Sequence, residues 1–364
     1  MIKETLKRLS LWVPQSIKMY VPQAVKQFFR RHYASRTVVI DIVGSCNLSC
    51  PSCPSGGVSG NRGGRMSLEM FRRIMEKVAR ENPGTTVAIF NWTEPLLHPQ
   101  VPEFIETIRE FGLKSRISTH LNNLQDPHRL ALSNPDGITI SLSGFTQEVY
   151  SIGHKDGDIE IVKNNMRRLS EALRANRATT EVTVYYHKYL HNLSEVDRMR
   201  EYAESLGLKF GAGWAYYMPI ERVHDYVEGR LPESEVAFVE ERFALNIRRA
   251  VAATEPYRAE PCAFPSTLLT LDCRGNVQLC CGVYDAERFT IGSYLDTPLK
   301  VIEQKLQTHS YCGECTAHGL HIYTSWHGHR INEKYEEIAT EEIERRASMP
   351  QFVKSEPVLG QNSK

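Results

Sequence analysis

The sequence lacks any run of 18 apolar residues, so it offers no segment long enough to span a bilayer as a helix. Its first residues lack a continuous apolar stretch followed by a small-residue cleavage site, so we expect no secretory signal. It also has little net charge, since 44 Lys and Arg residues face 43 Asp and Glu residues, giving +1. This balance argues against nucleic acid as the main partner. The length of 364 residues fits one large α/β domain with a smaller appendage.

The chain does not have an even number of cysteines. Nine are present in a sequence that we expect to be cytoplasmic, where disulfides are rare. We therefore interpret the cysteines as thiolates for metal binding or redox work and not as a disulfide framework.

Basic residues are concentrated at the N-terminus, where residues 1–36 carry eight Lys or Arg and one acid. Apolar residues recur there at helical spacing, and Pro14 and Pro22 interrupt the pattern. The segment predicts a basic amphipathic helical extension. Such an extension either packs on the main domain, which we favour, or makes a peripheral contact with an anionic membrane surface.

From residue 37 onward, β-branched runs alternate with amphipathic helical periods, which indicates parallel βαβ units wound right-handed. Six units predict a partial (β/α)6 barrel with its chemistry at the carboxyl ends of the strands. The expected strands are 37–43, 86–91, 115–120, 137–143, 181–187 and 209–214, and the expected helices include 68–80, 101–111, 159–173 and 193–206.

The region after the barrel is smaller. We expect one helix over 233–253, then a hairpin of strands 268–272 and 276–281 around Arg274-Gly275. The chain beyond Thr340 is polar and is expected to fray. The expected domains are therefore 1–36, 37–255, 256–330 and 331–364.

Three cysteines follow the first strand at the spacing C-x3-C-x2-C, namely Cys46, Cys50 and Cys53. Three thiolates this close can hold three corners of a cubane iron–sulfur cluster and leave one iron open to a small chelating molecule. Zinc is the alternative, but a structural zinc ion normally takes four ligands, and no fourth Cys or His lies nearby in the sequence.

This motif and its position resemble the radical S-adenosylmethionine superfamily. The resemblance implies that Cys46, Cys50 and Cys53 ligate a [4Fe–4S] cluster whose open iron binds S-adenosylmethionine. It also implies reductive cleavage of that cofactor to a 5′-deoxyadenosyl radical, which abstracts a hydrogen atom from the substrate. Many members have an aromatic residue just before the third cysteine, where this chain has Ser52.

Two further segments resemble cofactor-binding elements of the family. Trp92-Thr93-Glu94-Pro95 resembles the family's G-G-E-P element, which implies cofactor contacts by Thr93 and Glu94, although Trp92 and Thr93 replace its two glycines. The fourth strand places Ser141 and Ser143 on one face, where relatives contact the cofactor with hydroxyl or acidic groups. Both segments are also compatible with an ordinary turn and with ordinary strand-end hydroxyls.

A second cysteine set has the pattern C-x12-G-x4-C…C-x2-C. Four thiolates close one tetrahedral cage, which suits zinc or a fully ligated [4Fe–4S] cluster. Beside a radical S-adenosylmethionine core, the spacing resembles the twitch domain, a shortened relative of the SPASM extension. The resemblance implies one auxiliary cluster, so two clusters in all. Its implied ligands are Cys262, Cys280, Cys312 and Cys315.

Cys273 and Cys281 remain outside this set. If strand 276–281 carries Cys280 toward a cluster, Cys281 faces away, because successive side chains of a strand point to opposite faces. We interpret both as buried small hydrophobes. The alternative hypothesis makes Cys281 or Cys273 a hydrogen-atom donor that quenches a substrate radical.

Twitch enzymes include dehydrogenases and epimerases of sugars and aminocyclitols, which makes a hydroxyl-bearing carbon of a sugar, aminocyclitol or glycoconjugate the expected target. The expected partners are that substrate and a flavodoxin- or ferredoxin-type electron donor. Two alternatives stay open: a peptide-modifying maturase and a non-catalytic zinc- or cluster-binding protein. Residues His120, Tyr186, His187, Trp214 and Tyr216 lie near predicted strand ends and are candidates for the substrate pocket.

Overall fold

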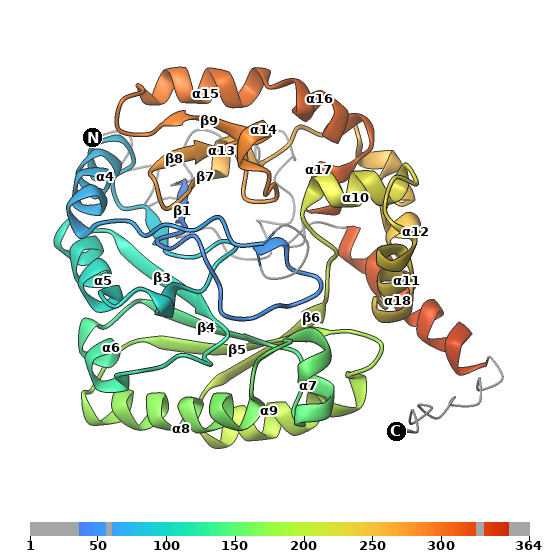
Figure 1. Ribbon diagram of the computed structural model, residues 1–364, viewed down its shortest axis with the longest axis horizontal. Helices are drawn as coiled ribbons and strands as arrows, with labels where there is room; N and C mark the ends of the chain where they lie inside the picture. The colour runs from blue at the N-terminus through green and yellow to red at the C-terminus, as the bar shows by residue number, and fades with distance from the viewer. Residues whose placement is uncertain (1–35, 56–59, 325–330, 349–364) are drawn as a thin grey trace, which may run out of the picture.

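A nine-stranded sheet organises the computed structural model, which describes residues 36–55, 60–324 and 331–348 (Figure 1). The strand order is β6-β5-β4-β3-β2-β1-β7-β8-β9. Apart from Arg36, the expected N-terminal extension lies outside the described residues.

The first six strands pair in parallel, each with its neighbour in sequence, and form a partial (β/α)6 barrel. The predicted fold class is therefore confirmed. Strands β1 and β2 are three residues shorter than expected because the chain turns there into the hydrogen-bonded loops of the site. The strands are β1 Thr37–Ile40, β2 Thr86–Ala88, β3 Lys114–Thr119, β4 Gly137–Leu142, β5 Glu181–Lys188 and β6 Lys209–Trp214.

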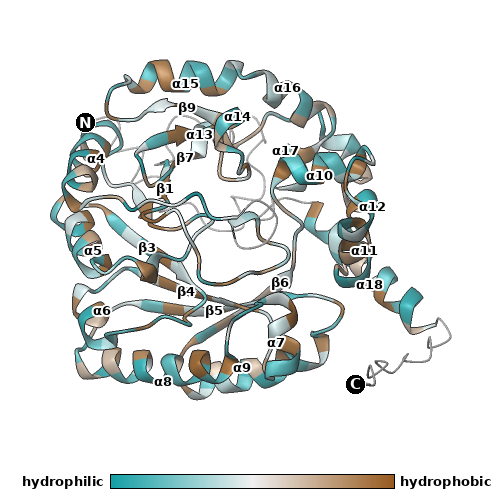
Figure 2. Ribbon diagram, in the orientation of Figure 1, coloured by the Kyte–Doolittle hydropathy of each residue, from teal (hydrophilic) through white to brown (hydrophobic). Residues whose placement is uncertain are grey.

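Amphipathic helices form an arc outside these strands in Figure 1. Brown and teal residues alternate along α8 in Figure 2, as expected for a helix with one face on the core. Phe71 and Phe104 join the first two helices across the core, with ring centroids 4.5 Å apart. These helices are α4 Leu68–Glu81, α5 Val101–Glu110, α6 Pro127–Ser133, α7 Gln147–Gly153, α8 Ile159–Ala175 and α9 Val196–Ser205.

The C-terminal part continues the barrel sheet. Strand β7 Leu268–Leu271 pairs in parallel with β1, and β8 Asn276–Gln278 and β9 Thr290–Ser293 then add in antiparallel fashion. Gly275 turns the predicted hairpin with φ +77°, a conformation that favours glycine. The prediction that the second hairpin strand reaches Cys281 was wrong, since β8 ends at Gln278.

Two helix predictions need correction. The single helix expected over 233–253 is broken into α11 Glu233–Arg242 and α12 Ile247–Ala252, because Phe243 is extended and Asn246 caps the second helix through the Arg249 N–H. The chain beyond Thr340 does not fray at once, since α18 Ile331–Ala347 continues through it.

The remaining elements are short helices that cover the C-terminal part and the open side of the barrel. In Figure 1, α10, α12, α17 and α18 gather beyond β6, while α15 and α16 lie over β9. Within the described residues, no helix is long and apolar enough to cross a membrane. These elements are η2 Pro95–Leu97, η3 Leu193–Glu195, α10 Ile220–Val227, η4 Glu255–Tyr257, α13 Phe264–Thr267, α14 Ala286–Phe289, α15 Leu299–Thr308, α16 Ser310–Ala317 and α17 Leu320–Tyr323.

Candidate functional site: two cysteine centres joined across the barrel mouth

The loop with the first three cysteines leaves the carboxyl end of β1 and closes on itself. The N–H of Gly44 donates to the carbonyl of Gly64 at 2.9 Å, and the N–H of Gly63 donates back to Gly44 at 2.8 Å. A Cβ on Gly44 would lie 2.1 Å from the Gly63 carbonyl oxygen, closer than any side chain tolerates. The loop therefore closes only with glycine at position 44.

Asn61, on the returning arm of this loop, holds the backbone of Cys46 from both sides. Its Oδ1 accepts from the Cys46 N–H at 2.9 Å, and its Nδ2 donates to the Cys46 carbonyl at 3.2 Å. The same arm contacts the C-terminal part, because the Tyr284 hydroxyl donates to the Gly60 carbonyl at 2.6 Å and the Arg62 guanidinium lies 4.0 Å from the Tyr284 ring centroid. Sequence reasoning missed Asn61, which belongs to no motif.

The three loop thiols are half-buried, and none of the three is in a disulfide. Burial raises the pKa of Cys46 to about 12, and a negative charge on Cys53 raises it further, while the Leu48 N–H lowers it. Burial and the other two sulfurs also raise the pKa of Cys50. Without a cation these groups stay protonated, so their ionisation requires the positive charge of a metal centre.

The spacing of these sulfurs distinguishes between a single ion and a cluster. In the part of the chain that the structure describes, the three sulfurs do not all lie within 4.8 Å of one another. Two sulfurs on one zinc ion can be at most about 4.6 Å apart, given Zn–S bonds of about 2.3 Å. The arrangement is too wide for one zinc ion and fits a larger cluster.

The turn after β2 is built on the buried carboxylate of Asp41, at the end of β1. This carboxylate accepts from the N–H groups of Asn91 at 2.9 Å and Trp92 at 3.2 Å, and from the Thr93 hydroxyl at 2.7 Å. Burial raises the pKa of Asp41, although these hydrogen bonds oppose the rise. The Thr93 side chain is thus directed to Asp41 and the Val43 carbonyl, so its predicted cofactor contact would have to come from its backbone.

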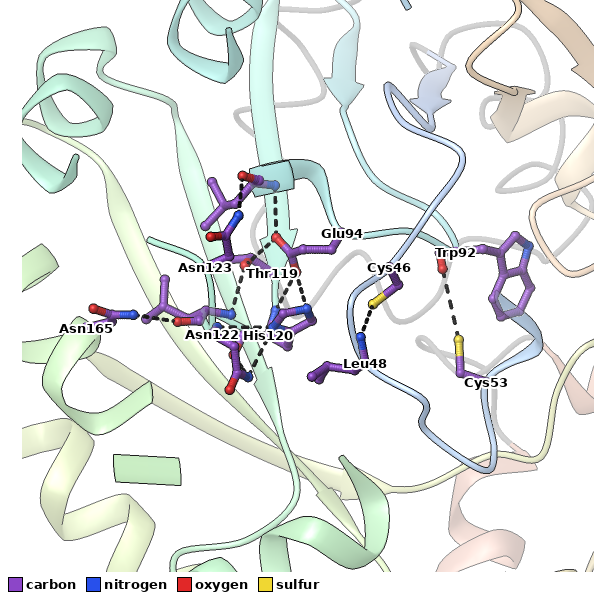
Figure 3. A network of polar contacts seen from close by, with 12 residues as sticks. Cys46, Leu48, Cys53, Trp92, Glu94, Thr119, His120, Asn122, Asn123 and Asn165 are labelled. Atoms are coloured by element: carbon purple, nitrogen blue, oxygen red, sulfur yellow. Dashed lines mark hydrogen bonds and ion pairs between the residues drawn. The ribbon is translucent and has the colours of Figure 1, made fainter. Parts of the chain in front are cut away.

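Glu94 is buried next to Cys46, and protein donors already occupy most of its carboxylate (Figure 3). Oε1 accepts from the Thr119 hydroxyl at 2.7 Å and the Leu96 N–H at 2.9 Å, and Oε2 accepts from the His120 N–H at 3.0 Å. One lone pair of Oε2 stays available for a cation such as an ammonium group.

His120 presents an unpartnered donor at the same place. Its Nδ1 accepts from the Asn122 N–H at 3.1 Å, so the ring proton is on Nε2. That Nε2 lies 3.2 Å from Glu94 Oε2 but outside hydrogen-bond geometry, and it is buried. A buried N–H of this kind calls for an acceptor, which a carboxylate ligand would supply.

The two predicted serines each contact a half-buried histidine. Ser141 Oγ lies 2.8 Å from His187 Nε2, and Ser143 Oγ lies 2.8 Å from His154 Nδ1. Burial lowers the pKa of His187 to about 4 and that of His154 to about 3, so both rings are neutral at pH 7. His154 was missed in the sequence because it follows α7, outside any strand end.

The other pocket candidates divide by their contacts. Tyr186 is fully buried and donates to the Asn192 carbonyl at 2.9 Å, so it belongs to the core. Tyr216 packs against Tyr323 at 5.5 Å. Trp214 lies under the Lys188 ammonium group at 3.5 Å from its ring centroid.

The second cysteine set converges on one pocket, whose lining includes Cys262, Cys280, Cys312 and Cys315. Helix α16 carries Cys312 and Cys315 one turn apart. Burial raises the pKa of Cys262 to about 11, and the Cys312 sulfur adds to this rise. Within the described residues, no three of these sulfurs lie together within 4.8 Å, so this site too is wider than one zinc ion.

Of the two cysteines outside both sets, Cys273 is buried as expected, whereas Cys281 does not lie on strand β8. Cys273 is buried, and its thiol donates to the Gly63 carbonyl at 3.5 Å, which places it under the returning arm of the first cysteine loop. Cys281 lies beyond β8, so the alternation of a strand does not turn it away from Cys280. Burial raises the pKa of Cys281 to about 12, and a charge on Cys262 contributes to the rise.

Comparison with known proteins identifies the barrel. The model of the Radical SAM superfamily matches residues 40–201, which include the three-cysteine loop, the Glu94 turn and the paired serines. This part of the chain is similar to the radical SAM superfamily. This similarity implies S-adenosylmethionine and one [4Fe–4S] cluster, and the thiols of the first loop and the buried His120 donor fit both.

Curated relatives match only in part. The chain is 27% identical over 127 residues to 7,8-dihydro-6-hydroxymethylpterin dimethyltransferase of Methanocaldococcus jannaschii, covering 33% of this chain and 25% of that protein. It is 26% identical over 155 residues to a probable GTP 3′,8-cyclase of Methanococcus maripaludis, covering 41% and 51%. The chain thus spans between a quarter and about half of the length of these relatives.

Solved structures share the fold. Streptococcus suis SuiB bound to the precursor peptide SuiA gives a TM-score of 0.52 at 12% identity, covering 80% of this chain and 69% of that one. Native anSMEcpe with bound AdoMet gives 0.50 at 16% identity, covering 85% and 98%. At these identities the likeness extends to the fold alone.

Proposed function

We propose that this radical SAM enzyme removes a hydrogen atom from a hydroxyl-bearing carbon of a sugar, aminocyclitol or glycoconjugate and completes an oxidation or an epimerisation. The observation that carries the proposal is the pairing of an incompletely ligated three-cysteine loop with a separate four-cysteine cavity. The neutral His187–Ser141 pair at the carboxyl ends of β4 and β5 adds a proton acceptor.

In this proposal, Cys46, Cys50 and Cys53 hold the first cluster. Glu94 receives the ammonium group of S-adenosylmethionine, His120 Nε2 donates to its carboxylate, and Ser141 and Ser143 contribute polar contacts. The bound cluster and cofactor supply a 5′-deoxyadenosyl radical, and the auxiliary cluster supplies a one-electron acceptor.

The chain's own residues then manage the proton and the substrate radical. For oxidation, the bound cofactor would take up a hydrogen atom from the carbon, and a cluster in the four-cysteine site would take up one electron. His187 accepts the hydroxyl proton, which leaves a ketone. For epimerisation, the thiol of Cys281 would return a hydrogen atom to the other face of the carbon. The thiyl radical left on Cys281 would be restored by a proton from solvent and by one electron from the external donor, passed through the auxiliary cluster.

Residues 256–330 form the auxiliary-cluster unit in this proposal, with Cys262, Cys280, Cys312 and Cys315 as four ligands. Full ligation suits electron transfer and not substrate binding through iron, because binding would displace a thiolate. Clusters of this kind require a reducing cytoplasm and an external donor of the flavodoxin or ferredoxin type.

Anaerobic reconstitution tests the proposal. We expect about eight iron atoms per chain and, with a reductant, release of 5′-deoxyadenosine. A Cys315→Ala variant should lose about half of this iron and all substrate turnover, but it should still cleave S-adenosylmethionine. Cys281→Ala is the matched control and should keep the iron. A Cys53→Ala variant should lose cofactor cleavage.

The substrate is found by deuterium transfer. Sugars and aminocyclitols deuterated at each hydroxyl-bearing carbon should pass deuterium to 5′-deoxyadenosine. Transfer from a peptide instead would favour a peptide-modifying maturase. Zinc in the cysteine sites without cofactor cleavage would favour a binding protein, and either result would contradict the proposal.

A further inference from the structure

A third group of metal-ligand side chains lies apart from both cysteine sites. His224, Glu228 and His318 each offer one ligand atom, and these atoms all lie within 4.8 Å of one another. His224 and Glu228 are four residues apart at the C-terminal end of α10, so they share one face, while His318 directly follows α16. Two helices distant in sequence thus converge on this point.

The ring of His318 is oriented as metal-bound imidazoles are. Its Nδ1 lies 2.9 Å from the Glu314 carbonyl oxygen, which can only accept, so Nδ1 carries the proton. Metal-ligating histidines typically donate their second ring N–H to such a carbonyl. The other nitrogen, Nε2, lies 3.2 Å from Glu228 Oε1. A neutral ring would place two acceptors face to face, so a cation or a proton belongs between them.

His224 completes the group from the buried side. It is 8% exposed, and its ring centroid lies 4.5 Å from that of His318. Burial lowers the pKa of His224, and the proximity of His318 lowers it further. A neutral imidazole next to a second imidazole and a carboxylate is a ligand that needs no deprotonation.

The spacing between the ligand atoms suits a tetrahedrally coordinated zinc ion. With zinc–ligand bonds of 2.0–2.1 Å, adjacent ligand atoms are about 3.4 Å apart, close to the spacing between His318 and Glu228. The second oxygen of Glu228 lies 3.7 Å from Arg230 Nη1, which leaves Oε1 as a single ligand atom. Two histidines and one glutamate are a donor set that zinc takes in proteins, with the fourth position left to water.

We propose that His224, Glu228 and His318 bind one zinc ion, which ties α10 to α16. Helix α16 carries Cys312 and Cys315, and its Tyr311 ring lies 6.2 Å from His224 and lines the four-cysteine cavity. The ion would therefore fix one wall of that cavity from behind. This site does not depend on the reaction proposed above.

The test uses the full-length chain with its cysteine sites loaded anaerobically with iron and sulfide. Zinc is added alone, the protein is desalted, and bound zinc is counted by mass spectrometry. We expect one retained zinc ion whose X-ray absorption shows a nitrogen and oxygen shell near 2.0–2.1 Å and no sulfur at 2.3 Å. Zinc should also raise the Tm.

Two variants each alter a proposed zinc ligand, and a third variant serves as the control. His318→Ala and the milder Glu228→Gln should each lower zinc retention at least tenfold and abolish the Tm rise. His128→Ala, which removes an exposed histidine on α6, should retain zinc like the unmodified chain. Absence of retained zinc, or zinc with a sulfur shell that persists in His318→Ala, would overturn the proposal and leave an imidazolium–carboxylate pair.

Discussion

The indole N–H of Trp92 donates a hydrogen bond to the carbonyl oxygen of Val283 at 3.0 Å. The carbonyl of Trp92 lies 4.0 Å from the Cys53 sulfur, and its ring packs edge-on against Tyr284 at 6.2 Å. Val283 follows Cys280 by three residues and lines the four-cysteine cavity. One residue, through its backbone carbonyl and its side chain, thus connects the three-cysteine loop to the wall of the second cysteine site.

Replacing Trp92 with Phe should remove this hydrogen bond and keep most of the ring packing. We expect the variant to lose about 1 kcal/mol of unfolding free energy, as measured by chemical denaturation. Trp214→Phe is the matched control, because the Trp214 indole N–H is buried and, among the described residues, has no hydrogen-bond partner. Equal losses in the two variants would contradict a specific role for the Trp92–Val283 bond.

Adding a methyl group at Gly44 should open the cysteine loop. A Cβ there would lie 2.1 Å from the Gly63 carbonyl oxygen, so the paired hydrogen bonds at the base of the loop must separate. We expect Gly44→Ala to reconstitute the first cluster poorly, with iron falling by about half while the auxiliary site stays loaded. Gly313→Ala is the control, since a Cβ there meets no atom within 4 Å. Full iron in Gly44→Ala would show that the loop tolerates the shift.

The buried carboxyl group of Asp41 should make the free energy of unfolding depend on pH. Burial raises its folded-state pKa above the usual value, so the folded chain holds a proton that the unfolded chain releases. The stabilising contribution of Asp41 to the free energy of unfolding is fully present below the unfolded-state pKa of about 3.9, and it is lost as the pH rises through the folded-state pKa. Asp41→Asn keeps an oxygen for the Asn91 and Trp92 N–H groups without the charge. The unfolding free energy of Asp41→Asn minus that of the unmodified chain should therefore rise with pH. Chemical denaturation of both proteins between pH 4 and 8 measures this difference. A difference that stays constant over this range would refute the prediction.

The strand pattern and the cysteine spacing were sufficient to predict the barrel and the two cysteine groups. Short β-branched runs between amphipathic helical stretches located all six barrel strands, because strands buried on both faces are rich in such residues. The ends of β1 and β2 could not be predicted, since they depend on hydrogen bonds from the 91–93 turn to Asp41, fifty residues earlier.

Other parts of the site depend on contacts that no local pattern encodes. Trp92 stands where the family has glycine, and only the fold shows that its indole reaches Val283. His154 pairs with Ser143 across the α7 segment, and Asn61 reaches back to Cys46. Cys281 was expected to face away from Cys280 because the strand was extended past Gln278, where β8 ends.

His187 provides the test of the proposed proton transfer. Burial lowers its pKa to about 4, so between pH 6 and 8 the ring is neutral and can accept a hydroxyl proton. We expect His187→Gln, which retains a partner for Ser141, to lower substrate oxidation by about 100-fold or more, the usual contribution of a general base. Formation of 5′-deoxyadenosine without substrate should persist, because the His187 ring has its hydrogen-bond partner in Ser141 on β4.

The pH profile separates this role from a structural one. In the unmodified enzyme, oxidation should be level from pH 6 to 8, since the His187 ring is already neutral there. In His187→Gln the residual rate should rise with pH, because hydroxide replaces the missing base. His128→Ala, which removes an exposed histidine far from the barrel mouth, should keep the level profile. A His187→Gln enzyme with an unchanged rate and profile would assign the proton to another acceptor, and an unchanged profile at a lower rate would indicate that His187 only positions Ser141.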